Sequence, residues 1–289
     1  MSNSIVTDGI QHLQLKGFWL NLNEAAERNE SILEQLSRLG IMSLYSRIEA
    51  PHGESKRAKE LGLEKGDWGA WMGWLKMLGA ACESEADIIH LIEDDIKITG
   101  DFLKLINWSE LMNLLNSGSI ICTDGYCSPS QAIAIYEHTK KKNSKQPDWQ
   151  IIKEGFHIPC INSILLTPST ALSLHNHLSN KLEATGSIPK IDIAIKDFSH
   201  GWLTLSPFCT GLSLKMSKQS TVGFHEEDNL ANSRIALSLL RCCLMSQVDQ
   251  EEIADELGSL INSLPKDKFT YFVVKMVGEL SELGHVKPF

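Results

Sequence analysis

Short apolar runs alternate with longer amphipathic segments along most of the chain. The first run, residues 17–22, has the length and apolar character of a buried strand. In the segment that follows, apolar side chains recur at helical spacing and form one face: Ile32, Leu33, Leu36 and Leu39. A second apolar run at residues 43–48 completes a strand–helix–strand unit. Such a unit predicts two parallel strands with ligands bound near their carboxyl ends.

Polar and glycine residues mark where the helices begin and end. Asn23 can cap the first helix by accepting from its free N–H groups, and Gly40 can end it. Asp67 can cap a later helix, on which Trp68, Trp71 and Trp74 recur at helical spacing. We expect this aromatic stripe to pack the helix on the sheet, in preference to forming a platform for stacked bases.

The same patterns extend through the rest of the chain. They predict helices at 54–63, 101–115, 168–182 and 189–198, and strands at 87–92, 119–123, 131–137, 149–154, 160–167 and 202–205. Beyond residue 226 the pattern is helical to the end and shows no chemistry of its own. We therefore predict an α/β protein with a leader at 1–16, one domain at 17–225 and a helical C-terminal segment at 226–289.

Composition and charge narrow the range of partners. The chain has 289 residues, of which 43% are hydrophobic, enough to bury a full core. Lys and Arg number 27 against 36 Asp and Glu, a formal net charge of −9. A negative balance of this size disfavours binding to a nucleic-acid backbone, so we expect no nucleic-acid partner.

The cysteines and the hydropathy pattern bear on location. Seven cysteines occur without a Cys-x-x-Cys pair, which favours reduced thiols. The N-terminus lacks the order of a signal peptide, and no apolar run is long enough to span a bilayer. We therefore expect a cytoplasmic protein without a transmembrane segment, which would meet any lipid-linked acceptor at the cytoplasmic face of a membrane.

The strongest chemical signal is three adjacent carboxylates, Glu93, Asp94 and Asp95, directly after the aliphatic run that ends at Ile92. Like charges this close repel one another, and a hard cation such as Mg²⁺ or Mn²⁺ can neutralise them. An exposed acidic turn explains the triplet about equally well. A calcium-binding loop does not explain the triplet, because Ile96 and Ile98 occupy positions at which such a loop needs oxygen ligands.

A series of spaced residues resembles glycosyltransferase family 25, the lipooligosaccharide galactosyltransferases. The resemblance spans about residues 17–225 in order. The matching positions are Asn21, Leu22 and Arg28; Arg47, Ala50 and Gly53; Leu91 through Asp95; Asn162 through Ala171; Pro189 and Asp192; Pro207 and Ser220. The resemblance implies a GT-A-type, Rossmann-like nucleotide-diphospho-sugar fold. It also implies a metal-dependent, inverting transfer of a hexose from a UDP-sugar to a surface glycan such as lipooligosaccharide.

The resemblance also implies roles for individual residues. Galactose is the favoured donor sugar, with glucose or an N-acetylated sugar left open. Direct metal ligands would be Asp95, then Asp94, with the late His225 as a third; a surface histidine is the alternative at 225. The donor would be bound by Asn21, Arg28, Arg47, Ala50, Glu93 and Asp94. Arginine suits forked contacts with phosphate oxygens, although surface ion pairing explains both arginines too.

An inverting enzyme needs a base for the acceptor hydroxyl. Asp192 is the first candidate, with helix capping as its alternative role, and Asp124 is the second. One stretch departs from the family: residues 69–74, where the family carries an acidic residue and a Ser-His pair, read Gly-Ala-Trp-Met-Gly-Trp. A non-catalytic sugar-nucleotide binding or scaffold protein therefore remains an alternative. A Mg²⁺-dependent phosphotransferase is a further one, although Asn21 stands where it would need a nucleophilic aspartate.

Overall fold

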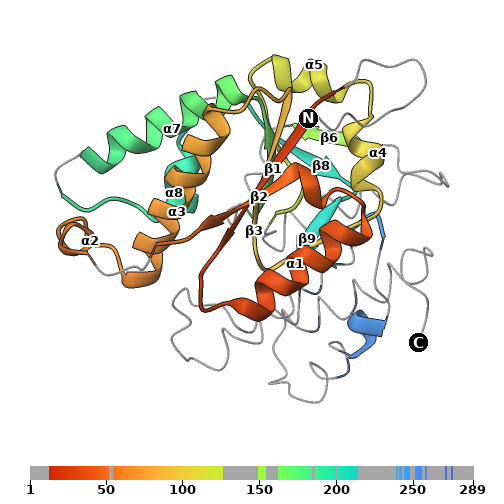
Figure 1. Ribbon diagram of the computed structural model, residues 1–289, viewed down its shortest axis with the longest axis horizontal. Coiled ribbons are helices and arrows are strands. Elements are labelled where there is room, and N and C mark those ends of the chain that lie inside the picture. Colours follow the sequence, from red (N-terminus) through yellow and green to blue (C-terminus); the bar gives the residue numbers. More distant parts are fainter. Residues whose placement is uncertain are drawn as a thin grey trace.

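A seven-stranded mixed sheet with helices on both faces forms the body of the protein (Figure 1). The structure, a computed structural model, describes residues 13–51, 55–125, 149–153, 162–183, 186–198 and 201–213, together with single positions and short stretches between 239 and 275. The predicted α/β class is confirmed, and the mixed sheet is compatible with a Rossmann-like fold.

The strands and helices follow the apolar pattern closely. The strands are β1 (Leu15–Asn21), β2 (Tyr45–Glu49), β3 (Ile88–Glu93), β4 (Ile96–Ile98), β5 (Ile120–Cys122), β6 (Gln150–Lys153), β7 (Ser163–Leu166), β8 (Trp202–Ser206) and β9 (Thr210–Leu212). The helices are α1 (Ala26–Arg38), the 3-10 turn η1 (Met42–Leu44), α2 (Lys56–Glu60), α3 (Lys65–Cys82), α4 (Phe102–Ile106), α5 (Leu111–Asn116), α7 (Pro168–Glu183) and α8 (Ile191–Lys196).

The direction in which the chain adds strands reverses between β1 and β3. The sheet runs β2-β1-β3-β7-β5-β8-β6, and β4 pairs with β9 in a separate two-stranded sheet. The predicted parallel pairing of β1 with β2 is confirmed, and β1 also pairs in parallel with β3. After β1 the chain continues to β2, which lies on one side of β1 in the sheet. The strands of this sheet that follow β3 in the chain lie on the opposite side of β3. Ligands of open α/β sheets bind at such a reversal, outside the carboxyl ends of the strands.

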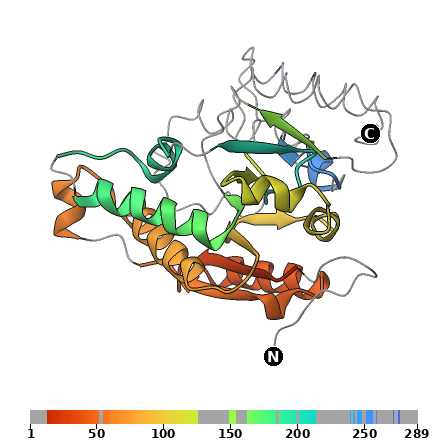
Figure 2. The same cartoon turned by 90° about the horizontal axis from the view of Figure 1, so that it is seen from above.

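Each face of the sheet has its own hydrophobic core. On one face, Phe18 and Leu91 pack with side chains of α3, α7 and α8. On the other face, Trp19 and Ile92 pack with α1, α4 and α5. Both views show α3 and α7 side by side, with α1 on the other side of the sheet (Figure 1, Figure 2). Because successive strand residues point to opposite faces, this division also decides which helices each residue at the strand end can meet.

The ends of α1 test two of the predicted helix signals. Gly40 adopts a positive φ of 69° directly after the helix, as expected for a glycine that ends one. The prediction that Asn23 caps the start was wrong, because the cap position is Ala25, without a side-chain hydrogen bond. Asn23 instead accepts a hydrogen bond from Arg47 at 2.8 Å. Competition from a neighbouring strand end therefore draws the asparagine away from the helix.

Helix α3 confirms the packing of the tryptophan stripe and corrects its predicted cap. Trp71 and Trp74 are fully buried in the core, and Trp68 packs against it. Glu64 is the cap residue, so the assignment of Asp67 to that role was wrong. Asp67 lies in the first turn, where it forms an ion pair with Lys190 at 3.3 Å.

One further prediction was wrong, and two short strands were missed. The helix expected at 101–115 is two short helices, α4 and α5, and the Asn107 side chain donates to the Leu103 carbonyl at 2.8 Å where α4 ends. The three-residue strands β4 and β9 were not predicted, because runs so short carry no period. The strand predicted at 131–137 and most of the helical segment at 226–289 lie outside the described residues.

A chain of buried hydroxyl and imidazole groups crosses the sheet. The Tyr45 hydroxyl and His90 Nδ1 lie 2.5 Å apart, and His90 Nε2 lies 2.8 Å from Ser163 Oγ. Ser163 continues to Thr123 at 2.6 Å, and Thr123 to Thr210 at 2.9 Å. A neutral imidazole can donate at one ring nitrogen and accept at the other, so the chain satisfies His90 without charge. Phe102 stacks on its ring.

Gly17 makes the first link of this chain possible. On β1, Gly17 pairs with Tyr45 of β2 on one side and with His90 of β3 on the other. A Cβ added at position 17 would overlap the Tyr45 ring. The absence of a side chain on the middle strand thus lets the tyrosine pass over it and reach the histidine.

We predict that Gly17→Ala lowers the free energy of unfolding by about 1–3 kcal/mol, because the added methyl group collides with the buried Tyr45 ring. Urea denaturation monitored by tryptophan fluorescence measures the loss. Gly79→Ala is the matched control, since the nearest atom to its added Cβ is 4.0 Å away and alanine favours a helix. Equal stabilities of the two variants would contradict the packing role of Gly17.

His90 should make the protein less stable in acid. Burial lowers the pKa of His90 to about 3, whereas an unfolded histidine titrates near ~6.5. Below pH ~6.5, His90 therefore binds a proton in the unfolded chain but stays neutral in the folded protein. The stability contributed by neutral His90 falls as the pH drops toward 3. Between pH 7 and 5 we expect wild type to lose about 2 kcal/mol relative to His90→Gln in urea denaturation. Comparing wild type with His90→Gln cancels the opposite pH effect of carboxyl groups such as Asp95, which both proteins share. A difference in stability between the two proteins that stays constant from pH 7 to 5 would contradict the role of His90.

Candidate functional site

Polar side chains gather where the parallel strands β1, β2 and β3 end. β1 ends at Asn21 and β3 at Glu93, and the Ala50 N–H after β2 donates to the Asn21 carbonyl at 2.9 Å. The acidic triplet begins at the last residue of β3 and continues into the turn before β4. The structure therefore places Asn21, Ala50 and the triplet on one edge of the sheet, as the sequence predicted.

Asp94 lies in a closed set of contacts on the α1 side of the sheet. Its Oδ2 accepts from the Asn21 side-chain amide at 2.7 Å, and its Oδ1 lies 3.1 Å from Arg28 Nη1. The same amide donates to the Ala25 carbonyl at 3.1 Å. All three polar side chains are buried. Both oxygens of Asp94 are thus occupied by groups of the protein.

Asp95 is buried but less completely paired. Its Oδ2 lies 3.9 Å from Arg28 Nη1, and its backbone carbonyl accepts from the Ser213 N–H at 2.7 Å. Asp95 Oδ1 has no hydrogen-bond partner among the described residues, and the same holds for Asn21 Oδ1 and Arg28 Nε beside it. Buried polar atoms in folded proteins almost always have a partner, so three such atoms at one strand end mark a place where hydrogen-bonding capacity is left unused.

Glu93 faces the opposite side of the sheet from Asp94. Its Oε1 accepts from the indole N–H of Trp74 on α3 at 3.1 Å. Asp192, in the first turn of α8, lies close enough that its charge acts on Glu93. The structure therefore brings the predicted base and the predicted donor-binding acid together, from elements separated by about a hundred residues.

The three acids hold their protons more tightly than ordinary carboxyl groups. Burial, followed by the charges of Asp95 and Asp192, raises the pKa of Glu93 well above its usual value. Burial and neighbouring Asp94 raise the pKa of Asp95 to about 6, despite the opposing charge of Arg28. Burial also raises the pKa of Asp94. The arginine thus offsets only part of the negative charge, and the site retains a capacity for further cationic charge.

Asp124, the second candidate base, is held in a buried ion pair. Arg241 Nη2 lies 2.5 Å from its Oδ2 and Arg241 Nε lies 3.3 Å from its Oδ1, and both side chains are almost fully buried. The Gly125 N–H also donates to Asp124 at 2.6 Å. Asp124 therefore offers no exposed oxygen to an acceptor hydroxyl, and Asp192 is the better placed of the two candidates.

Arg241 is the residue that the sequence prediction missed. It belongs to the C-terminal segment, which we expected to pack without chemistry, yet its charge also acts on Asp95. A detectable signal was present: Arg241 is a single charge within the apolar run Leu239 to Met245. A buried charge of this kind requires a partner, and Asp124 supplies it.

Two predicted site residues remain, Arg47 and His225. Arg47 is exposed in the middle of β2 and donates to Asn23, and its charge opposes the rise in the pKa of Asp94. His225, the third predicted metal ligand, lies outside the described residues. Within the described part of the chain, no group of three or more His, Cys, Asp or Glu side chains is arranged to hold a metal ion.

The residues nevertheless fit a cation in one respect. Asp95 Oδ1 is an orphaned carboxylate oxygen, and hard divalent cations prefer oxygen ligands of this type. Asp94 fits less well, because Arg28 and Asn21 already occupy both its oxygens. The structure thus favours Asp95 over Asp94 as a direct ligand, in the order that the sequence suggested.

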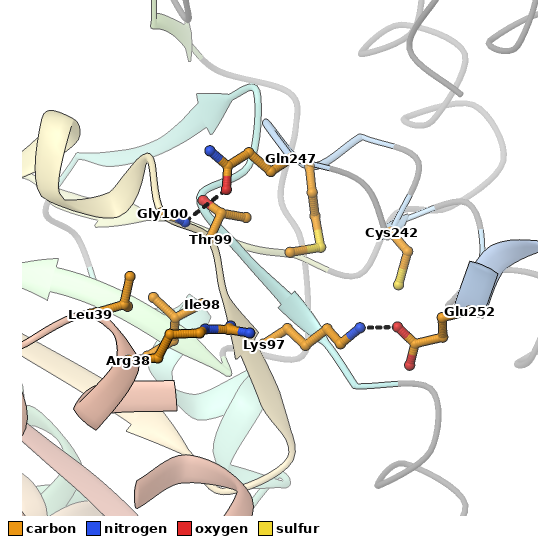
Figure 3. Close-up of a pocket in the computed structure, with 10 residues that line it drawn as sticks. Arg38, Leu39, Lys97, Ile98, Thr99, Gly100, Cys242, Gln247 and Glu252 are labelled. Atoms are coloured by element: carbon orange, nitrogen blue, oxygen red, sulfur yellow. Dashed lines mark hydrogen bonds and ion pairs between the residues drawn. The ribbon is translucent and has the colours of Figure 1, made fainter. Parts of the chain in front are cut away.

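A cavity of about 500 Å³ lies away from these acids, between the end of α1, strand β4 and the C-terminal segment (Figure 3). Lys97 and Glu252 form an ion pair across it, and Gln247 accepts from the Gly100 N–H at 3.0 Å. None of the acidic triplet lines it. The candidate site therefore rests on the strand ends and not on this cavity.

Comparisons with known proteins do not assign a family to this chain. The chain matches neither any protein-family model nor any curated protein in those searches. The resemblance to glycosyltransferase family 25 therefore stays a prediction carried by the spaced residues quoted above. Among the described helices, none combines the length and apolar character needed to cross a membrane. The four described cysteines for which pairing is known, Cys82, Cys122, Cys209 and Cys242, are free thiols.

We predict that Arg28→Met destabilises the protein by roughly 3–5 kcal/mol at pH 7, because it leaves the buried Asp94 carboxylate without its cation. Denaturation in urea measures the loss. Adding Asp94→Asn to this variant should recover much of the stability, since Asn21 can still donate to the new amide oxygen. Arg47→Met, at an exposed position, should change the stability by less than about 0.5 kcal/mol. A double variant no more stable than Arg28→Met alone would contradict the pairing.

Proposed function

We propose that this protein is a metal-dependent glycosyltransferase that moves a hexose from a UDP-sugar to a glycan acceptor. The observation that carries the proposal is the contact of Asn21, where β1 ends, with Asp94 of the acidic triplet, directly after β3; the charge of Asp192 also raises the pKa of Glu93. Two of the residues required by the resemblance, far apart in sequence, thus occupy one edge of the sheet. Galactose is the favoured sugar, and a lipooligosaccharide or other surface glycan is the favoured acceptor.

The chemistry assigned to the residues follows from their positions. The acceptor oxygen attacks the anomeric carbon, the bond from that carbon to the diphosphate oxygen breaks, and Asp192 takes the hydroxyl proton. Glu93, next to Asp192, is placed to hydrogen-bond the ribose or the donor sugar. Exposed Arg47, in the middle of β2, can form forked hydrogen bonds to a phosphate group.

Arg28 has a different role from the one first considered. It is buried against Asp94 and Asp95, so it holds the acidic residues in place instead of reaching out to the diphosphate. Asp95 would hold Mn²⁺ or Mg²⁺ through its unpartnered oxygen, with His225 and water as further ligands. When bound, the cation would neutralise charge on the leaving diphosphate.

One observation favours the non-catalytic alternative, a sugar-nucleotide binding or scaffold protein. The ion pair of Arg28 with Asp94 already supplies part of the positive charge that the triplet requires, so the acidic end of β3 can be stable without a metal ion. The phosphotransferase alternative has less support. Asn21 occupies the end of β1 and its amide group donates to both Asp94 and Ala25, which leaves no carboxylate nucleophile there.

Calorimetry with UDP, UDP-galactose and UDP-glucose, each with and without Mn²⁺, tests the proposal on the full chain. We expect binding that strengthens at least tenfold with Mn²⁺, followed by slow hydrolysis of the preferred UDP-sugar. Binding without turnover in an acceptor screen would favour the scaffold alternative. No binding of any UDP-sugar would overturn the proposal.

Asp95→Asn should abolish the Mn²⁺ dependence of UDP-sugar binding and leave the melting temperature unchanged or higher. The change removes a cation ligand and also relieves repulsion between neighbouring carboxylates. Calorimetry and differential scanning fluorimetry measure the two effects. Glu85→Gln, an exposed acid near the opposite end of β3, is the matched control and should retain wild-type binding. Unchanged Mn²⁺ dependence in Asp95→Asn would remove Asp95 from the site.

A further inference from the structure

We propose that Trp71 and Trp74 of α3 are positioning residues whose indole N–H groups hold the two functional acids, Asp192 and Glu93, in place. This inference rests on the proposed function for the roles of the two acids. It assigns a purpose to residues 69–74, the stretch in which the chain departs from the family pattern. In place of a Ser-His pair, this stretch supplies two buried hydrogen-bond donors.

Trp74 acts on Glu93 directly. Its side chain is completely buried, and its indole N–H donates to Glu93 Oε1 at 3.1 Å. An indole N–H is a single donor on a rigid ring, so it fixes both the position and the orientation of the carboxyl oxygen that it meets. Glu93 is only partly buried, so its side chain is within reach of a bound ligand.

Trp71 acts on Asp192 through the start of α8. Its side chain is also completely buried, and its indole N–H donates to the Pro189 carbonyl at 3.0 Å. Pro189 lies two residues before α8, whose first turn carries Asp192. The hydrogen bond therefore ties the beginning of α8 to α3. A shift of this segment would move Asp192 relative to Glu93.

Gly73 brings the two tryptophans within reach. A Cβ added there would lie 2.7 Å from Leu20 on β1, so the helix approaches the strand more closely than an alanine would allow. This close approach places Trp74 over the end of β3, next to β1 in the sheet. The glycine and the two tryptophans thus form one structural unit, which sets the distance between α3 and the acids.

The unit has a clear electrostatic purpose. The charge of Asp192 contributes to raising the pKa of Glu93, so each carboxyl group disfavours the ionised form of the other. Without fixed hydrogen bonds the two side chains would move apart to reduce this repulsion. The indole donors oppose that movement, so the donor-binding acid and the base keep the spacing that transfer of a sugar to a hydroxyl requires.

Tryptophan-to-phenylalanine substitutions test the roles, because they remove the N–H and keep an aromatic ring. The variants are Trp74→Phe and Trp71→Phe. Trp68→Phe on the same helix is the matched control, since the Trp68 indole makes no hydrogen bond within the described part of the chain. Urea denaturation confirms that all three variants fold before any function is compared.

The first measurement needs no ligand. In ¹⁵N spectra of indole groups, Glu93→Ala should shift the Trp74 signal and speed its hydrogen exchange, and the Trp68 signal should stay unchanged. An unaltered Trp74 signal would overturn the direct contact. The Trp71 indole donates to a backbone carbonyl that precedes Asp192 in the chain. Asp192→Ala should therefore leave the slow hydrogen exchange of the Trp71 indole unchanged. Fast exchange of Trp71 in the wild type would overturn the tie to α8.

The second measurement separates the two roles in function. Trp74→Phe should weaken UDP-sugar binding about tenfold, and this effect should vanish in a Glu93→Ala background if Trp74 acts through Glu93. Trp71→Phe should leave UDP-sugar binding within twofold and lower turnover at least tenfold. Equal effects of all three tryptophan variants would mean a structural role only and would overturn the proposal.

The two measurements also separate this inference from the proposed function. If wild type binds no UDP-sugar, the proposed glycosyltransferase function fails, and the roles assigned to the two acids fail with it. The indole spectra then still decide whether Trp74 holds Glu93. If wild type binds and turns over UDP-sugar while Trp74→Phe and Trp71→Phe behave like Trp68→Phe, the positioning role alone is wrong.

Discussion

The buried contact of Arg28 with Asp94 is the interaction on which the end of the sheet depends. Asp94 follows β3 directly, at the point where the chain reverses direction beside β1, and it is buried with Arg28 and Asn21. An unpaired carboxylate there would cost several kcal/mol. The arginine comes from the first turns of α1, so the same contact joins β1, β3 and α1 and holds these strand ends in place.

From this fixed point the three acids separate by the simple geometry of a strand. Glu93 faces α3 and α8, where Trp74 and Asp192 meet it, whereas Asp94 turns toward α1. Asp95 lies beyond both and keeps one oxygen without a partner. A triplet that looks uniform in the sequence therefore becomes three different groups: one held by an indole, one by a guanidinium, and one available for a cation.

The sequence predicted the elements better than their ends. Long apolar periods located β1, α1, α3 and β3, because burial on two faces leaves a strong pattern. Asn23 and Asp67 were misassigned as caps, since both side chains are drawn to partners from distant segments, Arg47 and Lys190. The partner of Asp94 was predicted to be a metal ion. Arg28 had been assigned to the donor, and no local pattern shows that an arginine on the next helix folds back onto a strand end.

Arg241 is another residue whose partner no local sequence pattern predicts, and it affects the site as a whole. Its pairing with Asp124 spans more than a hundred residues, so only the folded chain reveals it. Because its charge also acts on Asp95, the C-terminal segment contributes to the charge balance at the strand ends. Three guanidinium groups, those of Arg28, Arg47 and Arg241, thus stand against five carboxyl groups, those of Glu93, Asp94, Asp95, Asp124 and Asp192. Burial, followed by neighbouring carboxyl groups, raises the pKa of Glu93 and of Asp95, and a divalent cation at Asp95 would offset the negative charge.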